Sequence, residues 1–151
     1  MNFHKLGLAA VLAGGVAFAG NAWADAHGET PQIQHRVAVM KIIGGDIGAI
    51  AKVAKGEAEY SPALVERAKR MEALSKTVMV LFPEGSQGRR AKAEIWSDWA
   101  GFEKASNAFS DAMPALVSAV ESGDKGQIGA ALGAVGKSCG GCHKPFRTPK
   151  E

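Results

Sequence analysis

The sequence is short of several features that define whole classes of protein. Its 151 residues include only two cysteines, six prolines and 7% aromatic residues, and its formal net charge is +3. Two cysteines cannot build a disulfide-dense scaffold. So small and scattered a charge does not by itself indicate nucleic-acid binding. The rest of the composition is ordinary for a globular protein, and the length of the chain allows one domain. It is rich in Ala, Lys and Glu and sparse in β-branched residues, which favours helix over sheet.

Residues 1–24 have the pattern of a cleaved export signal. Lys5 supplies a positive start, residues 6–20 form an apolar stretch too short to span a bilayer comfortably, and residues 22–24 give the A-x-A cleavage pattern. We therefore expect a mature domain of residues 25–151 that is located in the periplasm and has no membrane span. An uncleaved membrane anchor is the alternative.

Hydrophobic residues in the mature chain recur at alternating spacings of three and four, which is typical of amphipathic helices. The helical runs extend from Thr30-Pro31 to Gly56, from Ser61-Pro62 to Val78, from Ile95 to Val120 and from Ile128 to Phe146. Residues 81–90 are expected to form a loop, and Pro114 is expected to kink or restart the third run. Without any strand pattern, these runs predict an all-α fold, an antiparallel four-helix bundle. A looser helical domain with other crossing angles is the alternative.

Residues 139–143 read C-x-x-C-H, the attachment pattern for a c-type haem. Cys139 and Cys142 are three residues apart, so on a helix their sulfur atoms share a face and can form thioethers with the two vinyl groups of one porphyrin. His143 follows directly and can offer a ring nitrogen to the iron. Three other interpretations remain: a thioredoxin-like redox disulfide, a zinc site and a simple structural disulfide.

The chain also resembles the class II c-type cytochromes, the cytochrome c prime family. The resemblance rests on Arg36 and on the segments 40–44, 55–57, 82–85, 93–96 and 135–143. It implies a four-helix bundle that carries one covalent haem c through Cys139 and Cys142, with His143 as the axial ligand. It further implies that Arg36 lies beside a haem propionate and that the segment containing Glu94 lines the haem pocket.

The ligand on the opposite side of the iron determines what such a protein does. The Met-Lys-x-x-Gly run that begins at Met40 resembles the low-spin, methionine-ligated branch of the family, and a thioether is a soft ligand for haem iron. We therefore expect a non-enzymatic electron-transfer protein with His143 and Met40 as axial ligands. The alternative is a five-coordinate, high-spin protein that binds nitric oxide or carbon monoxide, with Met40 only packing over the iron.

The expected partners follow from charge and from the resemblance. Lys137, Lys144, Arg147 and Lys150 cluster around the attachment site, where they could steer an acidic redox protein. A solvated helix end is the simpler interpretation. The family resemblance also leaves a homodimer open, while nucleic acid is not expected as a partner. After cleavage, residues 25–27 would begin the chain as Asp-Ala-His, a possible copper ligand set or simply a tail.

Overall fold

The computed structural model describes residues 30–149, which form five α-helices and one 3-10 helix. The helices are α1 (Pro31–Ala54), α2 (Ala63–Ser75), η1 (Met79–Leu81), α3 (Glu94–Ser97), α4 (Trp99–Ser122) and α5 (Lys125–Phe146). None of the helices in this part of the chain is long and apolar enough to cross a membrane. The predicted export signal and the Asp-Ala-His sequence lie outside the described residues and stay predictions.

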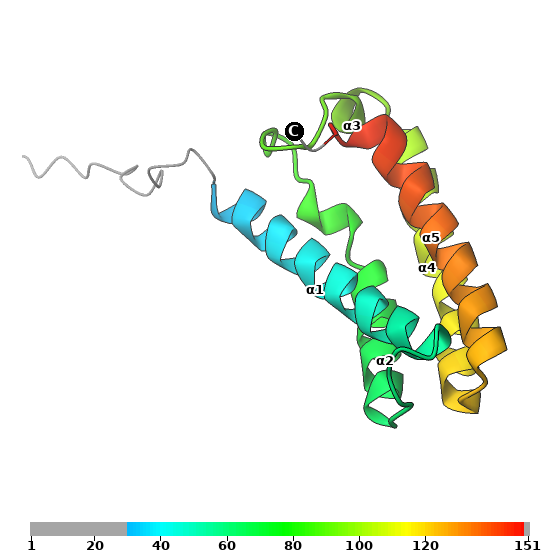
Figure 1. Cartoon of the computed structure of the whole chain (residues 1–151). Helices are drawn as coiled ribbons and strands as arrows, with labels where there is room; N and C mark the ends of the chain where they lie inside the picture. The colour runs from blue at the N-terminus through cyan, green and yellow to red at the C-terminus, as the bar shows by residue number, and fades with distance from the viewer. Residues whose placement is uncertain (1–29, 150–151) are drawn as a thin grey trace, which may run out of the picture.

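The four long helices form the predicted antiparallel bundle. Each packs against two others, with the main contacts between α1 and α2, α2 and α4, α4 and α5, and α5 and α1. Figure 1 shows α4 and α5 side by side with opposite directions, and α3 at the end of the bundle where α5 finishes. The buried side chains of all four helices make one hydrophobic core. The fold class predicted from the periodicity is thus confirmed.

Two helix starts are capped by side chains, and the one at Thr30 was predicted. Thr30 Oγ1 accepts a hydrogen bond from the backbone N–H of Ile33 at 3.4 Å, and Pro31 occupies the first turn of α1. Asp124 Oδ1 accepts from the N–H of Gln127 at 2.7 Å at the start of α5. These acceptors satisfy backbone donors that have no partner within the helix.

Glycines end two of the helices and shape the predicted loop. Gly56 and Gly123, with φ of +74° and +70°, follow α1 and α4 in the left-handed region that glycine adopts without strain. In the loop, Gly85 and Gly88 have φ of +80° and +139°. Both ends and the loop agree with the sequence prediction.

The third predicted run differs from the structure. The helix does not stop at Pro114, which lies inside α4. The break is instead at Asp98, which separates α3 from α4 with φ −124° and ψ 60° and whose Oδ1 accepts from the N–H of Gly101 at 3.0 Å. Burial of Met113 and Leu116 around the proline holds the helix together, because tertiary packing outweighs the loss of one hydrogen bond.

The buried face of α1 differs from the one that the spacing of hydrophobic residues predicts, which combines Arg36 with Met40, Ile43, Ile47, Ile50 and Ala54. Arg36, Ile43 and Ile50 are buried as predicted, while Met40, Ile47 and Ala54 are only half-buried. Asp46 is buried in addition, with 3% of its side chain exposed, because two arginines of α2 bind it. The periodicity of apolar residues cannot predict that Asp46 is buried, since Asp46 is charged.

Candidate cofactor-binding site

A cavity of about 300 Å³ opens at the end of the bundle where α5 finishes. Its volume lies at the lower end of the range for small-molecule sites, roughly 300–1,000 Å³. Its walls come from the first half of α1, the loop after η1, α3, α4 and the end of α5. The floor is apolar and is made by Val78, Phe82, Ile95, Phe102 and Phe146, all of them buried. Such a floor suits a flat, largely apolar ligand.

Three of the predicted cofactor residues meet at this cavity. Cys142 and His143 of α5 line it, and so does Met40 of α1, all three of them half-buried. Cys139, one helical turn before His143, is half-buried and packs against the core. A thioether from α1 and an imidazole from α5 therefore face one space, although they are about a hundred residues apart in sequence.

Burial determines the protonation of the two cysteines and the histidine. It raises the pKa of the Cys142 thiol to about 11, with a further contribution from the neighbouring Cys139, and it also raises the pKa of Cys139. The pKa of His143 is lowered by burial and then by the positive charges of Arg147 and Arg90. At neutral pH the thiols are protonated and the imidazole is neutral, so a ring nitrogen has its lone pair available.

Arg36 is a buried cation at the wall of the cavity, with 5% of its surface exposed. Its Nη1 donates to Ser86 O at 3.2 Å and to Ser86 Oγ at 3.4 Å, and its Nη2 donates to Gly88 O at 3.4 Å. The guanidinium also lies 4.6 Å from the centre of the Phe82 ring. These acceptors are all uncharged, and burial lowers the pKa of Arg36. A buried guanidinium held only by neutral groups fits beside an anionic ligand group.

The loop that lines the cavity is tied to the end of α5. Arg90 donates from Nε and Nη2 to Thr148 O at 3.0 and 2.7 Å, and Thr148 N–H donates to Arg90 O at 2.9 Å. Ala91 pairs with Arg147 in an isolated bridge, and Lys92 N–H donates to Phe146 O at 3.1 Å. We call these pairings the loop–α5 strap. The strap brings Arg90 and Ala91 to the cavity.

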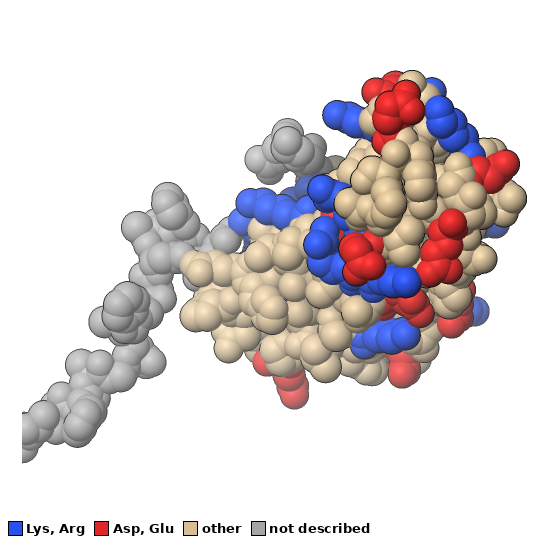
Figure 2. Space-filling model, turned by 90° about the horizontal axis from the view of Figure 1, so that it is seen from below, with Lys and Arg blue, Asp and Glu red and all other residues tan. Residues whose placement is uncertain are grey.

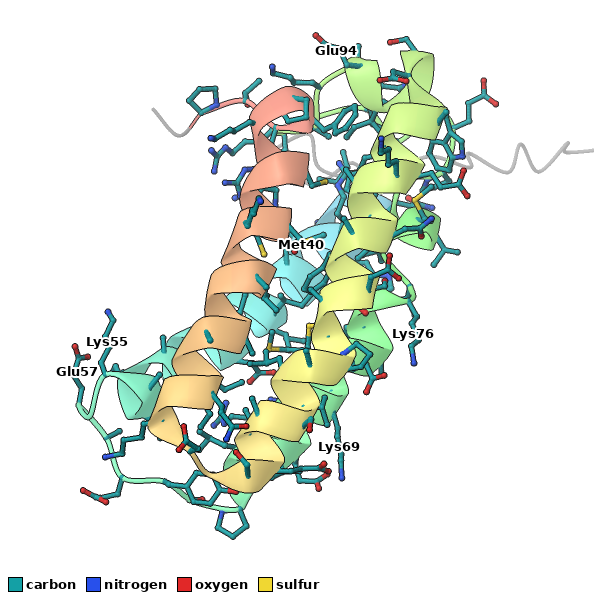
Figure 3. The ribbon with its side chains drawn as sticks, turned by 90° about the vertical axis from the view of Figure 1, so that its right-hand side faces the viewer. Met40, Lys55, Glu57, Lys69, Lys76 and Glu94 are labelled. Atoms are coloured by element: carbon teal, nitrogen blue, oxygen red, sulfur yellow. The ribbon has the colours of Figure 1, made fainter. Side chains whose placement is uncertain are left out.

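The structure places Glu94 differently from the other predicted residues. Glu94 is exposed at the first residue of α3 and does not line the cavity, whereas its neighbour Ile95 does. Figure 3 shows the Glu94 side chain on the outside of that end of the molecule. Trp96 Nε1 donates to Pro83 O at 3.1 Å and so holds α3 against the loop. The segment therefore reaches the cavity through its apolar residue.

Sequence reasoning missed part of the lining. Arg89, Arg90 and Lys41 also line the cavity. No motif marks the two arginines, because the loop–α5 strap, which joins distant parts of the chain, positions them. Within residues 30–149, no three His, Cys, Asp or Glu side chains lie close enough to share a metal ion. The zinc interpretation of the C-x-x-C-H pattern therefore has no ligand set in this part of the chain.

Comparison with known proteins explains the combination of bundle and cavity. The family model "Cytochrome C'" matches residues 31–147. The chain belongs to the cytochrome c' family. Cytochrome c' of Rhodospirillum rubrum is 36% identical over 118 residues, covering 76% of this chain and 80% of that protein.

Solved structures of cytochromes c' have the same fold as this chain. The cytochrome c' of Rubrivivax gelatinosus superposes with a TM-score of 0.71 at 34% identity, covering 78% of this chain and 94% of that one. A nitric oxide complex of a variant of Alcaligenes xylosoxidans cytochrome c' gives 0.72 at 32% identity, with the same coverage.

Membership of the cytochrome c' family carries one covalent haem c, as the C-x-x-C-H pattern predicted. The residues that line the cavity fit a haem. The cavity combines an apolar floor, a cysteine, a neutral imidazole and a buried guanidinium that donates to the uncharged oxygens of Ser86 and Gly88. The comparisons point to cytochromes c' as such and do not single out the methionine-ligated branch.

Proposed function

We propose that this protein is an exported, periplasmic cytochrome c' whose haem iron binds small gases, nitric oxide or carbon monoxide, at an open sixth position. The observation that carries this proposal is the match to cytochromes c' over nearly the whole described chain, with a nitric oxide complex among the similar structures. This differs from the sequence-based expectation of methionine ligation and electron transfer, and agrees with the alternative named beside it.

The cavity residues would divide the work of holding the haem. Cys139 and Cys142 would form the two thioether links, and His143 would hold the iron through a ring nitrogen that is neutral in this environment. Arg36 would bind a propionate, since its buried guanidinium donates to uncharged oxygens of Ser86 and Gly88 and still carries its positive charge. When bound there, a ferrous haem would supply an iron atom that binds diatomic gases.

The α1 side of the cavity would control what reaches that position. Val37 and Met40 line it from α1, and both are half-buried. Side chains of this kind exclude water and charged ligands but leave room for a small neutral gas. One observation favours a second candidate, an electron-transfer protein: the Met40 thioether lies at the same cavity as His143, where sulfur could ligate the iron.

Absorption spectra of the purified holoprotein separate the two candidates. For an open site we expect a high-spin ferric spectrum, carbon monoxide binding by the reduced protein, and no change of spin state in Met40→Leu. Met79→Leu is the matched control, because Met79 is also half-buried but does not line the cavity. A low-spin ferric protein that binds carbon monoxide only after Met40 is replaced would reject the open site and establish Met40 as a ligand.

A further inference from the structure

The polar side chains around the cavity carry almost only positive charge. Arg36 lies at the wall, and the opening is surrounded by Lys41, Arg89, Arg90 and Arg147, which we call the basic rim. Of these four, Arg90 is half-buried and the other three are exposed. No Asp or Glu is among the described residues that line the cavity.

The basic residues of α2 that form ion pairs, and Lys76, which follows the helix, are paired with carboxylates. Arg67 and Arg70 bind Asp46 at 2.8 and 2.6 Å. Lys69 and Lys76 pair with glutamates at 3.0 and 3.2 Å. On the face in Figure 2, which is seen from below, the blue and red side chains are interleaved. The five basic lining residues exceed the net charge of +3 for the whole chain, so the rest of the protein carries a slight excess of negative charge.

A bound haem would not cancel this asymmetry. Its two propionates can neutralise at most two of the five lining cations, and Arg36 is placed to meet one of them. Arg90 and Arg147 line the cavity together with His143. Glu84 and Glu94, which flank Arg89 and Arg90 in the sequence, are exposed and lie outside the cavity lining. A positive surface therefore surrounds the entrance through which an electron would reach the haem.

We propose that the basic rim is the docking surface for an acidic redox protein that supplies the electron needed to keep the haem ferrous. The inference rests on the proposed function, because the iron must be reduced before it binds carbon monoxide. One electron leaves the partner's cofactor and converts ferric iron to ferrous. Charge complementarity would raise the rate of encounter more than the affinity.

Stopped-flow reduction of the ferric holoprotein tests the proposal. The acidic donor is a flavodoxin in its hydroquinone form, and the cationic donor is the methyl viologen radical. We expect the rate with flavodoxin to fall at least about tenfold between low and high salt. The rate with the viologen should stay constant or rise, because salt screens repulsion as well as attraction. Salt dependence of the same sign for both donors would overturn the proposal.

A lysine of α1 and the lysine that follows its last residue give a matched pair of variants. Lys41→Gln removes one charge from the basic rim, and Lys55→Gln removes the same charge at the far end of α1, where Figure 3 shows it far from Met40. At low salt we expect Lys41→Gln to slow reduction by flavodoxin about twofold, the effect of one charge acting across ~10 Å of water. Lys55→Gln should have little effect, and equal effects would refute the docking site.

A binding measurement gives a readout that does not depend on electron transfer. Amide chemical shifts of the holoprotein during titration with flavodoxin should change around residues 36–41, 88–92 and 144–147, and the changes should vanish in high salt. Changes confined to α2 would overturn the proposal. If the haem is present and binds carbon monoxide but these results fail, only the docking surface is refuted. Absence of gas binding would instead refute the proposed function.

Discussion

Asp46 is the buried carboxylate that ties α1 to α2, and its replacement by asparagine tests how the wall of the cavity is held. Arg67 Nη1 donates to its Oδ1 at 2.8 Å, and Arg70 donates from Nη2 to Oδ1 at 2.6 Å and from Nε to Oδ2 at 2.9 Å. The carboxylate side chain is 3% exposed, while the two arginine side chains are 44% and 49% exposed. In Asp46→Asn the shape is kept, but the negative charge is lost and an amide NH₂ faces two cations.

The size of the loss follows from this burial. Removing one partner of a fully buried pair costs about 3–5 kcal/mol. Here the cations are half-exposed and can turn to water, so screening lowers the figure. Charged hydrogen bonds contribute about 1.5–3 kcal/mol. We expect Asp46→Asn to lower the free energy of unfolding by about 2–3 kcal/mol. For a chain of this size that corresponds to a fall in Tm of roughly 4–12 °C.

Thermal unfolding of the holoprotein, followed by circular dichroism at 222 nm, measures this loss. Asp111→Asn is the matched control, because Asp111 is an exposed residue of α4, and we expect it to change the stability by less than about 0.5 kcal/mol. Arg67→Gln should cost less than Asp46→Asn, since Arg70 would still neutralise the carboxylate. Equal stability of the Asp46 and Asp111 variants would refute the reasoning that the buried ion pair fixes α1 on α2.

Two further predictions concern the cavity floor and the loop. Phe102 is 1% exposed and packs its ring against Phe82 and Phe146 at centroid distances of 4.8 and 5.4 Å. Phe102→Ala should therefore lower the free energy of unfolding, measured in urea, by about 3–5 kcal/mol. A loss below about 1 kcal/mol would contradict this packing. Gly88 has φ +139°, and a Cβ there would lie 2.9 Å from Ile33 Cδ1, so Gly88→Ala should destabilise by about 1–3 kcal/mol. In the same assay Gly129→Ala, where a Cβ meets nothing within 4 Å, should stabilise by about 0.4–1 kcal/mol; the same sign for both glycines would be evidence against the loop geometry.

Local signals in the sequence predicted most of the helix boundaries correctly. Thr30 caps α1 and Gly56 ends it as predicted, because each requirement involves only neighbouring residues. The last helix begins three residues before the predicted Ile128, after the N-cap Asp124. Pro114 misled the prediction because packing on the rest of the bundle keeps α4 intact around it. The break at Asp98 had a usable signal, because aspartate is a preferred N-cap residue.

The cavity was only partly predictable, for a related reason. Cys142 and His143 belong to a short motif, so their pairing is visible in the sequence. Met40 was predicted from the family resemblance. Arg36 was predicted from the resemblance and from the helix spacing. The positions of Arg89 and Arg90 depend on hydrogen bonds between Arg90 and Thr148, which are 58 residues apart. Nothing local in the sequence specifies that contact.

The loop–α5 strap links the completion of the cavity to the last residues of the chain. The ligand candidates end at His143, but the wall formed by residues 90–92 is hydrogen-bonded to residues 146–148. A chain cut back to residue 145 would keep Cys139, Cys142 and His143 and would lose the partners of Arg90, Ala91 and Lys92. The C-x-x-C-H pattern and the wall that faces it can therefore be altered independently of each other.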